Sequence, residues 1–348
     1  TIALETETGA VAVFPPPHRY FYPLDEAYNL GFTWWGAGFM DHVSGFGIGV
    51  RQDLQGDRRW VPWFNAPPGT KQELGIFWLA SRDRGDKLFD RVKAYTHGDR
   101  FPELAGHKIF TSHYHIEHTT RLIEERAKGK SPGVPLALKK PDFVDVFKKA
   151  GIQIVHLAEF HNRLGRLRRD PVKALPLLKT LHEECARLSG DGFLLLPGEE
   201  PNVHLGGHWI SFFPRPVMWV LNRSKDKPFT EEHPQFGRVY HVGSPEDVLK
   251  LMEREGGLMW AAHPRIKSST GYPDLYRDTA FFKSDRYLGG AWKDMPADLS
   301  KPRLGWRVLN LLDDTSNWGA KKYILGEVDI FQGDRTTEFY AHANVNYL

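Results

Sequence analysis

Three histidines lie close together in the stretch TSHYHIEHTT, residues 111–120. His113 and His115 are separated by one residue, and His118 follows. The apolar residues before them predict a β-strand, on which residues two apart point to the same side. The imidazoles of His113 and His115 are therefore placed to bind one metal ion, although solvated or core histidines at a strand end would give the same pattern.

Other polar residues are found at the ends of other predicted strands. They are His161 after IQIVHLAEF, Glu199 and Glu200 after FLLLPG, His208 at the start of HWISFF, His263 after LMWAA, and Asp329 near the end of YILGEVDI. In a parallel barrel the carboxyl ends of all strands open on one face, where catalytic sites are built. Scattered core histidines would not repeatedly choose the same end, so the pattern favours a metal site.

The composition sets the class of protein and the type of ligand. The 348 residues are 41% hydrophobic and 26% charged, which is ordinary for a soluble globular protein. A net charge of +3 does not favour nucleic acid or membrane partners, and no apolar run is long enough to span a bilayer. The single cysteine, Cys185, excludes an intrachain disulfide and a cysteine-based metal site. Imidazole and carboxylate ligands suit zinc, manganese or iron.

The sequence pattern changes near residue 106. Residues 1–105 contain short apolar or aromatic runs separated by glycine and proline, which predicts a β-rich N-terminal domain closed by a helix within DKLFDRVKAYTHG. The tryptophans of this segment favour a packed β-core, with a sugar-binding surface as the alternative; they are Trp34, Trp35, Trp60, Trp63 and Trp78. The first residue, Thr1, is consistent with either a trimmed chain or a removed signal peptide, and so with export.

Residues 106–348 alternate predicted strands with predicted helices. The helices include PDFVDVFKKAG, PVKALPLLKTLHEECARLSG with Pro176 as an interruption, SPEDVLKLMEREGG with Ser244 as N-cap, and GWRVLNLLDD. Such alternation predicts parallel βαβ units, and the segment is long enough for a barrel.

The order of these motifs resembles the polymerase and histidinol phosphatase (PHP) superfamily. The resemblance covers roughly residues 106–332 and rests on HYH, FHN, PGEE with GGHW, AAHPR and VDIF. It implies an α/β fold, a distorted (β/α)7 TIM-like barrel with divalent metal ions at its mouth, here preceded by the smaller β-rich domain. It also implies hydrolysis of phosphoesters or, in the branch of the carbaryl hydrolases, of carbamate or aryl esters.

The resemblance also implies a role for each candidate. His113, His115 and Asp329 resemble ligands of a first metal, His208 and His263 those of a second, and Glu200 the bridge between them, with Glu199 as the fallback. His161, with His118 beside it, would serve a third metal. The chain has Phe160 and Phe331 where the family has Asp and His, so we expect two ions. An alignment shifted by one or two residues would instead offer Asp334 or His342.

The expected reaction is hydrolysis of a small-molecule phosphoester, carboxyl ester or carbamate by a metal-activated water. We expect His161 to bind substrate or move a proton. Arg265 is expected to meet an anionic group, together with Lys267 and the loop arginines Arg163, Arg166, Arg168 and Arg169, unless that loop is only solvated.

Two other classes of function stay open. One is a non-catalytic binding module whose metal site has decayed, which Phe160 and Phe331 favour. The other is an amidohydrolase-type barrel, which also begins with His-x-His but normally has a lysine after a mid-barrel strand, and the sequence offers none placed so.

Overall fold

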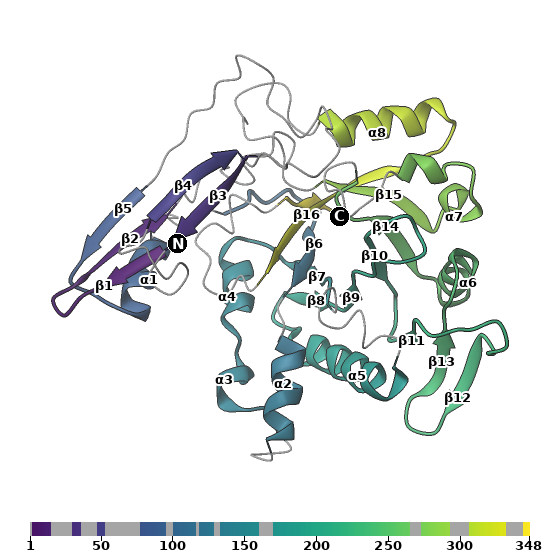
Figure 1. Ribbon diagram of the computed structural model, residues 1–348, viewed down its shortest axis with the longest axis horizontal. Coiled ribbons are helices and arrows are strands. Elements are labelled where there is room, and N and C mark those ends of the chain that lie inside the picture. Colours follow the sequence, from purple (N-terminus) through teal and green to yellow (C-terminus); the bar gives the residue numbers. More distant parts are fainter. Residues whose placement is uncertain are drawn as a thin grey trace. The chain divides into compact units, whose positions relative to one another are not determined.

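The computed structural model describes residues 2–14, 30–35, 47–52, 77–94, 100–115, 118–128, 133–159, 170–264, 273–292, 306–331 and 344–348. The chain divides into two compact units, and the first change from one to the other lies between Arg100 and Phe101. Figure 1 shows the described helices and strands as ribbons. The domain boundary at residue 105 stays a prediction. No helix in the described ranges combines the length and the apolar character needed to cross a membrane.

In the residues that the structure describes, the first unit contains two small antiparallel sheets and one helix. Their bounds are β1 (Ile2–Glu5), β2 (Ala10–Phe14), β3 (Leu30–Trp35), β4 (Gly47–Gln52), β5 (Phe77–Ser81) and α1 (Asp86–Ala94). One sheet has the order β1-β2-β5, and β3 pairs with β4. The predicted run RWVPWF lies outside the described residues.

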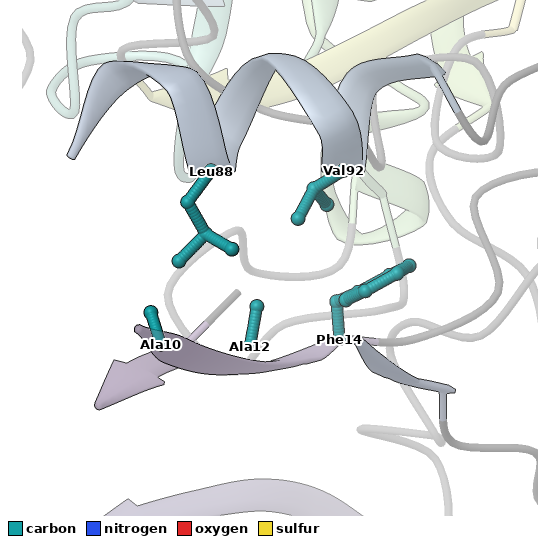
Figure 2. Close-up of a cluster of buried hydrophobic side chains, with 5 residues drawn as sticks. All are labelled: Ala10, Ala12, Phe14, Leu88 and Val92. Atoms are coloured by element: carbon teal, nitrogen blue, oxygen red, sulfur yellow. The ribbon is translucent and has the colours of Figure 1, made fainter. Parts of the chain in front are cut away.

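The helix α1 covers one face of the first sheet. Ala10, Ala12 and Phe14 alternate along β2 and therefore point to the same face, where they pack against Leu88 and Val92 of α1 (Figure 2). Leu88 and Val92 are four residues apart, so they lie one turn apart on the same side of the helix. The spacing of two residues in the strand and of four residues in the helix thus produces this cluster.

We expected Trp78 in a packed β-core, but the structure places its side chain at the surface. Its side chain is 69% exposed, whereas its neighbours Phe77 and Leu79 pack against the cluster under α1. Alternation along β5 places Trp78 on the opposite face of the strand. The side chains of the other four tryptophans lie outside the described residues.

The second unit holds the remaining elements. Its strands are β6 (Ile109–His115), β7 (Ile154–Leu157), β8 (Leu194–Leu196), β9 (Gly198–Glu199), β10 (Trp209–Phe212), β11 (Met218–Val220), β12 (Thr230–His233), β13 (Gly237–His241), β14 (Leu258–Ala261), β15 (Tyr287–Trp292), β16 (Tyr323–Phe331) and β17 (Asn346–Tyr347). Its helices are α2 (His118–Ala127), α3 (Leu136–Lys139), α4 (Asp142–Lys149), α5 (Pro171–Leu188), α6 (Pro245–Glu255), α7 (Ala280–Lys283) and α8 (Trp306–Asn317), with a 3-10 turn at Pro273–Tyr276.

The main sheet is a nearly closed, barrel-like sheet. Its order is β8-β7-β6-β16-β15-β14-β10-β9, with β17 added beside β6. The two end strands, β8 and β9, are separated in the chain by Pro197 alone. Beyond Pro197 the backbone continues parallel to the chain that follows β7, where the amide of Glu159 donates a hydrogen bond to the carbonyl of Gly198 at 3.0 Å.

One strand of the barrel departs from the expected parallel arrangement. β10 is antiparallel to both of its neighbours, β9 and β14. A parallel pair needs a long crossover connection, usually a helix, whereas residues 200–208 between β9 and β10 contain no helix. This reversal brings the start of β10, rather than its end, to the edge where the neighbouring parallel strands finish.

The helices agree with their sequence signals, with one correction. Asp170 caps α5, whose first residue is proline, and the helix continues through Pro176, which the sequence marked as an interruption. Ser244 caps α6 by accepting a hydrogen bond from the amide of Asp247, and Gly256 ends it in the left-handed conformation. The sequence did not predict the three-stranded sheet β11-β13-β12 inserted between β10 and α6.

Candidate metal centre

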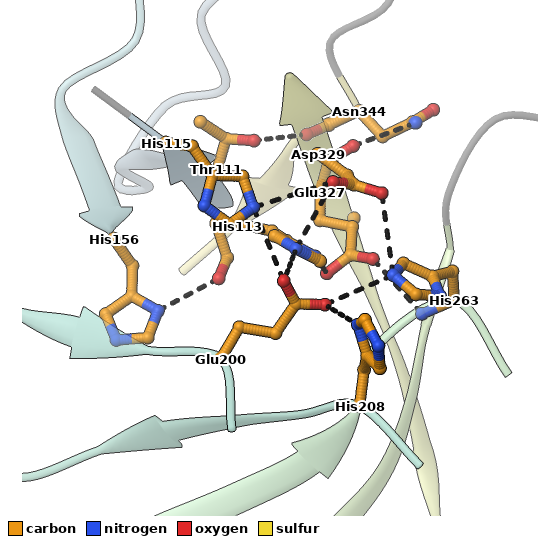
Figure 3. Close-up of polar contacts among 12 residues, drawn as sticks. Thr111, His113, His115, His156, Glu200, His208, His263, Glu327, Asp329 and Asn344 are labelled. Carbon is orange, nitrogen blue, oxygen red and sulfur yellow. Dashed lines mark hydrogen bonds and ion pairs between the residues drawn. The ribbon is translucent and has the colours of Figure 1, made fainter. Parts of the chain in front are cut away.

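The structure brings all six predicted metal ligands into one buried cluster (Figure 3). They are His113 and His115 on β6, Glu200 directly after β9, His208 directly before β10, His263 shortly after β14, and Asp329 on β16. Because β10 is reversed, His208 precedes its strand and still lies at the same edge as the residues that end parallel strands.

Glu200 lies at the centre of the cluster, and its two oxygens face different histidines. Oε2 lies 3.1 Å from Nε2 of His113 and 3.4 Å from Nε2 of His115. Oε1 lies 2.9 Å from Nδ1 of His208 and 3.2 Å from Nε2 of His263. One carboxylate therefore joins a pair of histidines on β6 to a pair from β10 and β14.

Asp329 approaches the same two pairs. Oδ1 lies 3.3 Å from Nε2 of His113 and 3.7 Å from Nε2 of His115, while Oδ2 lies 3.6 Å from Nε2 of His263. Two overlapping triplets have donor atoms within 4.8 Å of one another: His113 with Glu200 and His263, and His113 with His115 and Asp329.

The donor atoms around Nε2 of His113 fit a metal ion by distance, whereas Nδ1 of His208 and Nε2 of His263 each form a hydrogen bond with Glu200. Ligand atoms about 2.1 Å from one tetrahedral ion lie about 3.4 Å from each other, and the separations at Nε2 of His113 are 3.1 and 3.3 Å. This buried nitrogen makes no hydrogen bond of ordinary geometry despite those close oxygens. A nitrogen lone pair and carboxylate oxygens that converge without hydrogen-bond alignment are suited to a shared cation.

The backbone of the ligands is bent away from regular strand geometry. Five described residues other than glycine have positive φ angles, and His113 (65°), His263 (33°) and Asp329 (38°) are three of them. The pairing register also shifts beside two of these, between Thr111 and Tyr114 in β6 and between Glu327 and Ile330 in β16. Such bulges redirect side chains, and strained backbone is concentrated at functional sites.

Electrostatics in the cluster favour a bound cation. Burial lowers the pKa of His113, but the carboxylates of Asp329, Glu200 and Glu327 outweigh it and hold that pKa well above its usual value. The pKa of His115 is raised in the same way, against burial, by Asp329 and Glu200. Several buried carboxylates need positive charge nearby, because an unpaired buried charge is very unfavourable.

Glu327 is the residue of this site that the sequence reading missed. Its carboxylate is fully buried on β16, with Oε2 2.9 Å from Nδ1 of His113. Burial raises the pKa of Glu327, although His113 acts in the opposite direction. The signal was the spacing Glu-x-Asp, since Glu327 and Asp329 are two apart on one strand, as His113 and His115 are.

His118 has a different role from the one considered for it. It begins α2, and its Nε2 lies 2.8 Å from Oε2 of Glu184 on α5. It therefore joins two helices instead of extending the cluster. Glu199, the fallback for Glu200, lies in β9 and pairs with Ser211 of β10.

Several predicted residues lie outside the described residues. Both predicted catalytic residues, His161 and Arg265, are among them, with Phe160, Asp334, His342, Lys267 and the loop arginines Arg163, Arg166, Arg168 and Arg169. The same holds for the side chain of Phe331. The roles of these residues stay predictions.

Comparison with known proteins gives one distant likeness. No protein-family model and no curated protein matches this chain. A crystal structure of a two-domain protein from Bacteroides vulgatus, which contains a predicted PHP-like metal-dependent phosphoesterase, is similar with a TM-score of 0.37 and 17% identity. The match covers 67% of this chain and spans 56% of the length of that protein.

Proposed function

We propose that this protein is a metal-dependent hydrolase that holds two divalent ions and cleaves a phosphoester, carboxyl ester or carbamate with an activated water. One observation carries the proposal: the two oxygens of Glu200 face separate histidine pairs inside a buried cluster. A carboxylate so placed is suited to bridging two ions. Zinc, manganese and iron suit these nitrogen and oxygen ligands.

The six candidate ligands would form two sets, one for each ion. His113, His115 and Asp329 would hold the first ion, His208 and His263 the second, and Glu200 both. Ions bound there would lower the pKa of a water molecule and polarise the bond under attack. The side chains of these six residues are at most 7% exposed, so the charges act in a medium of low dielectric.

The finer assignments belong to the same proposal. We place His161 and Arg265 beside the substrate, the first to bind it or move a proton and the second to meet an anionic group. The substrate is a small molecule, and the barrel has seven units if β8 and β9 form one bent strand.

An amidohydrolase-type barrel is the alternative enzyme. Such a site would need a lysine beside the histidines. Among the described residues the buried lysine is Lys322, which precedes β16 and donates hydrogen bonds to the carbonyls of Ser284 and Tyr287 at 2.9 and 2.7 Å. Asp329 lies seven positions further along the chain, within β16, so the two Cα atoms are about 23 Å apart at the usual rise of a strand.

Metal analysis distinguishes the enzyme from a binding module with a decayed site. Purified wild-type protein should carry divalent metal, and His113→Asn with His115→Asn should lower the metal bound per chain. His107→Asn changes an exposed histidine and serves as the matched control. A folded double variant with unchanged metal content would contradict the ligand assignment.

Activity tests the second half of the proposal. Wild-type protein loaded in turn with Zn²⁺, Mn²⁺ or Fe²⁺ is screened against phosphoester, carboxyl ester and carbamate substrates. We expect turnover in at least one class and its loss in the double variant. Metal binding without any turnover would favour the binding module.

A further inference from the structure

The carboxylate of Glu327 contacts two residues of the cluster, His113 and His263. Its Oε2 lies 2.9 Å from Nδ1 of His113, at ion-pair distance but without hydrogen-bond alignment. Its Oε1 accepts a hydrogen bond of 3.4 Å from the backbone amide of His263 (Figure 3). One carboxylate thus contacts the side chain of one metal-ligand candidate and the backbone of another, on two different strands.

The two nitrogens of His113 face different carboxylates. Nε2 faces Glu200 and Asp329, at 3.1 and 3.3 Å, whereas Nδ1 faces Glu327. A neutral imidazole carries its proton on one nitrogen and a lone pair on the other. The negative oxygen beside Nδ1 favours the proton there, which leaves the lone pair on Nε2 for an ion among the other ligands.

The backbone at both contacts is in a conformation that needs support. His113 and His263 have φ angles of 65° and 33°. A residue other than glycine is strained in this region and persists there only where surrounding contacts fix it. Glu327 contacts both of these residues, and Asp329, two positions along the same strand, has a positive φ as well.

We propose that Glu327 is a positioning residue that fixes His113 with its proton on Nδ1 and anchors the backbone of His263. It thereby sets one ligand of each ion without binding either. This inference rests on the proposed metal function. A residue that only filled space would need no charge. Burying a carboxylate costs free energy unless a cationic or hydrogen-bonding partner compensates for the lost water.

The test replaces the charge and keeps the shape. In Glu327→Gln the affinity for Zn²⁺, measured by competition with a chromophoric chelator, should fall about 10–100-fold, as is typical for outer partners of metal ligands. Glu255→Gln is the matched control, because Glu255 is also a buried carboxylate, and its hydrogen bonds come from Arg215 and Tyr240. Its Zn²⁺ affinity should equal that of the wild type.

Nitrogen-15 NMR of the Zn²⁺-loaded wild type reads the tautomer directly, with His113 assigned by the signal lost in His113→Asn. We expect the proton on Nδ1. A proton on Nε2, or unchanged Zn²⁺ affinity in folded Glu327→Gln, overturns the role of Glu327 and leaves the metal function standing. If Glu327→Gln does not fold, the wild-type spectrum decides. A wild type that binds none of Zn²⁺, Mn²⁺ and Fe²⁺ overturns the metal function itself and this inference with it.

Discussion

Two adjacent glutamates show how much one position matters in this site. Glu199 and Glu200 are both buried, but the contacts of Glu200 reach histidines on three strands or strand ends. Neighbours in an extended segment point to opposite sides. The carboxylate of Glu199 is therefore expected to face away from the histidine cluster.

We predict that Glu200→Gln removes much more metal than Glu199→Gln. The amide lacks the charge that both histidine pairs face, so its effect should exceed the roughly 10–100-fold loss seen for outer partners of ligands. Elemental analysis after gel filtration and hydrolysis rates measure the difference. An equal loss in both variants, or a larger one in Glu199→Gln, would show that the bridge is assigned to the wrong residue.

At the scale of elements, the helices α2 and α5 are joined by a buried polar pair. His118 lies 2.8 Å from Glu184, which also accepts a hydrogen bond from Arg187 at 3.0 Å. Arg187 also donates hydrogen bonds to the carbonyls of Lys139 and Leu138, and it thereby connects Glu184 to α3. Burial raises the pKa of Glu184, but His118 and Arg187 outweigh it and lower that pKa to about 2 from 4.5.

This pKa predicts a pH-dependent contribution to stability. A carboxyl group with a lowered folded-state pKa stabilises the protein above pH 4.5, and the contribution is lost as the pH falls toward 2. Glu184→Gln should lower the free energy of unfolding by about 2 kcal/mol at pH 7, allowing for solvent around Arg187. The gap to the wild type, followed by urea unfolding, should shrink below pH 4.5.

The matched control is Glu183→Gln, because Glu183 is exposed and lies 3.7 Å from Lys179 one turn away. Surface pairs of this kind contribute about 0.5 kcal/mol or less. A gap between wild type and Glu184→Gln that stays constant from pH 7 to pH 3 would show that the charge of Glu184 is not the source.

The closure of the barrel depends on Gly198, which lies two residues before Glu200. A Cβ added at Gly198 would overlap Nε2 of His156 and the carbonyl of Leu157. His156 is fully buried, accompanied by Ser112 at 2.9 Å, and burial lowers its pKa to about 3, so it stays neutral. β9 can approach β7 here because residue 198 has no side chain.

We predict that Gly198→Ala both destabilises the protein and weakens metal binding. Overpacking costs about 1–3 kcal/mol, and moving β9 displaces Glu200, two residues on. Gly192→Ala is the control: with φ at +77° and open space around it, it adds about 1 kcal/mol of backbone strain without a clash. Thermal unfolding and metal content are compared. Normal metal content in a destabilised Gly198→Ala variant would show that β9 can shift without displacing Glu200.

At the scale of the whole molecule, the candidate metal centre draws its predicted ligands from across the second unit. They span residues 113–329 of the chain and lie on β6 and β16 or next to β9, β10 and β14. Buried carboxylates converge there, and their mutual repulsion opposes folding unless cations compensate it. Ligands that bind only the folded state stabilise it by mass action.

Chelation should therefore lower the melting temperature. With free metal at 100 times the dissociation constant, binding contributes about 2.7 kcal/mol, equivalent to roughly 5–10 °C for a domain of this size. Calorimetry with and without EDTA measures the shift, and added Zn²⁺, Mn²⁺ or Fe²⁺ should reverse it. The double variant at His113 and His115 should show a smaller response. An equal shift in that variant would mean that the metal acts elsewhere.

The sequence alone determined features that depend on residue type and local spacing. Histidines and carboxylates at strand ends predicted which side chains would meet, because the period of a strand and the direction of parallel strands are local rules. Helix limits at Ser244 and Gly256 followed from capping in the same way. The overall pattern of strand and helix was thereby predictable for most of the second unit.

Only the tertiary structure decided the features that depend on partners distant in the chain. The reversal of β10 follows from a short connection, and it alone brings His208 to the cluster. The contact of Glu327 with His113 joins positions 214 residues apart, which no local period encodes. The exposure of Trp78 likewise depends on which face of its sheet α1 covers. Burial and electrostatic partnership arise from packing, so they appear only when the strands are placed side by side.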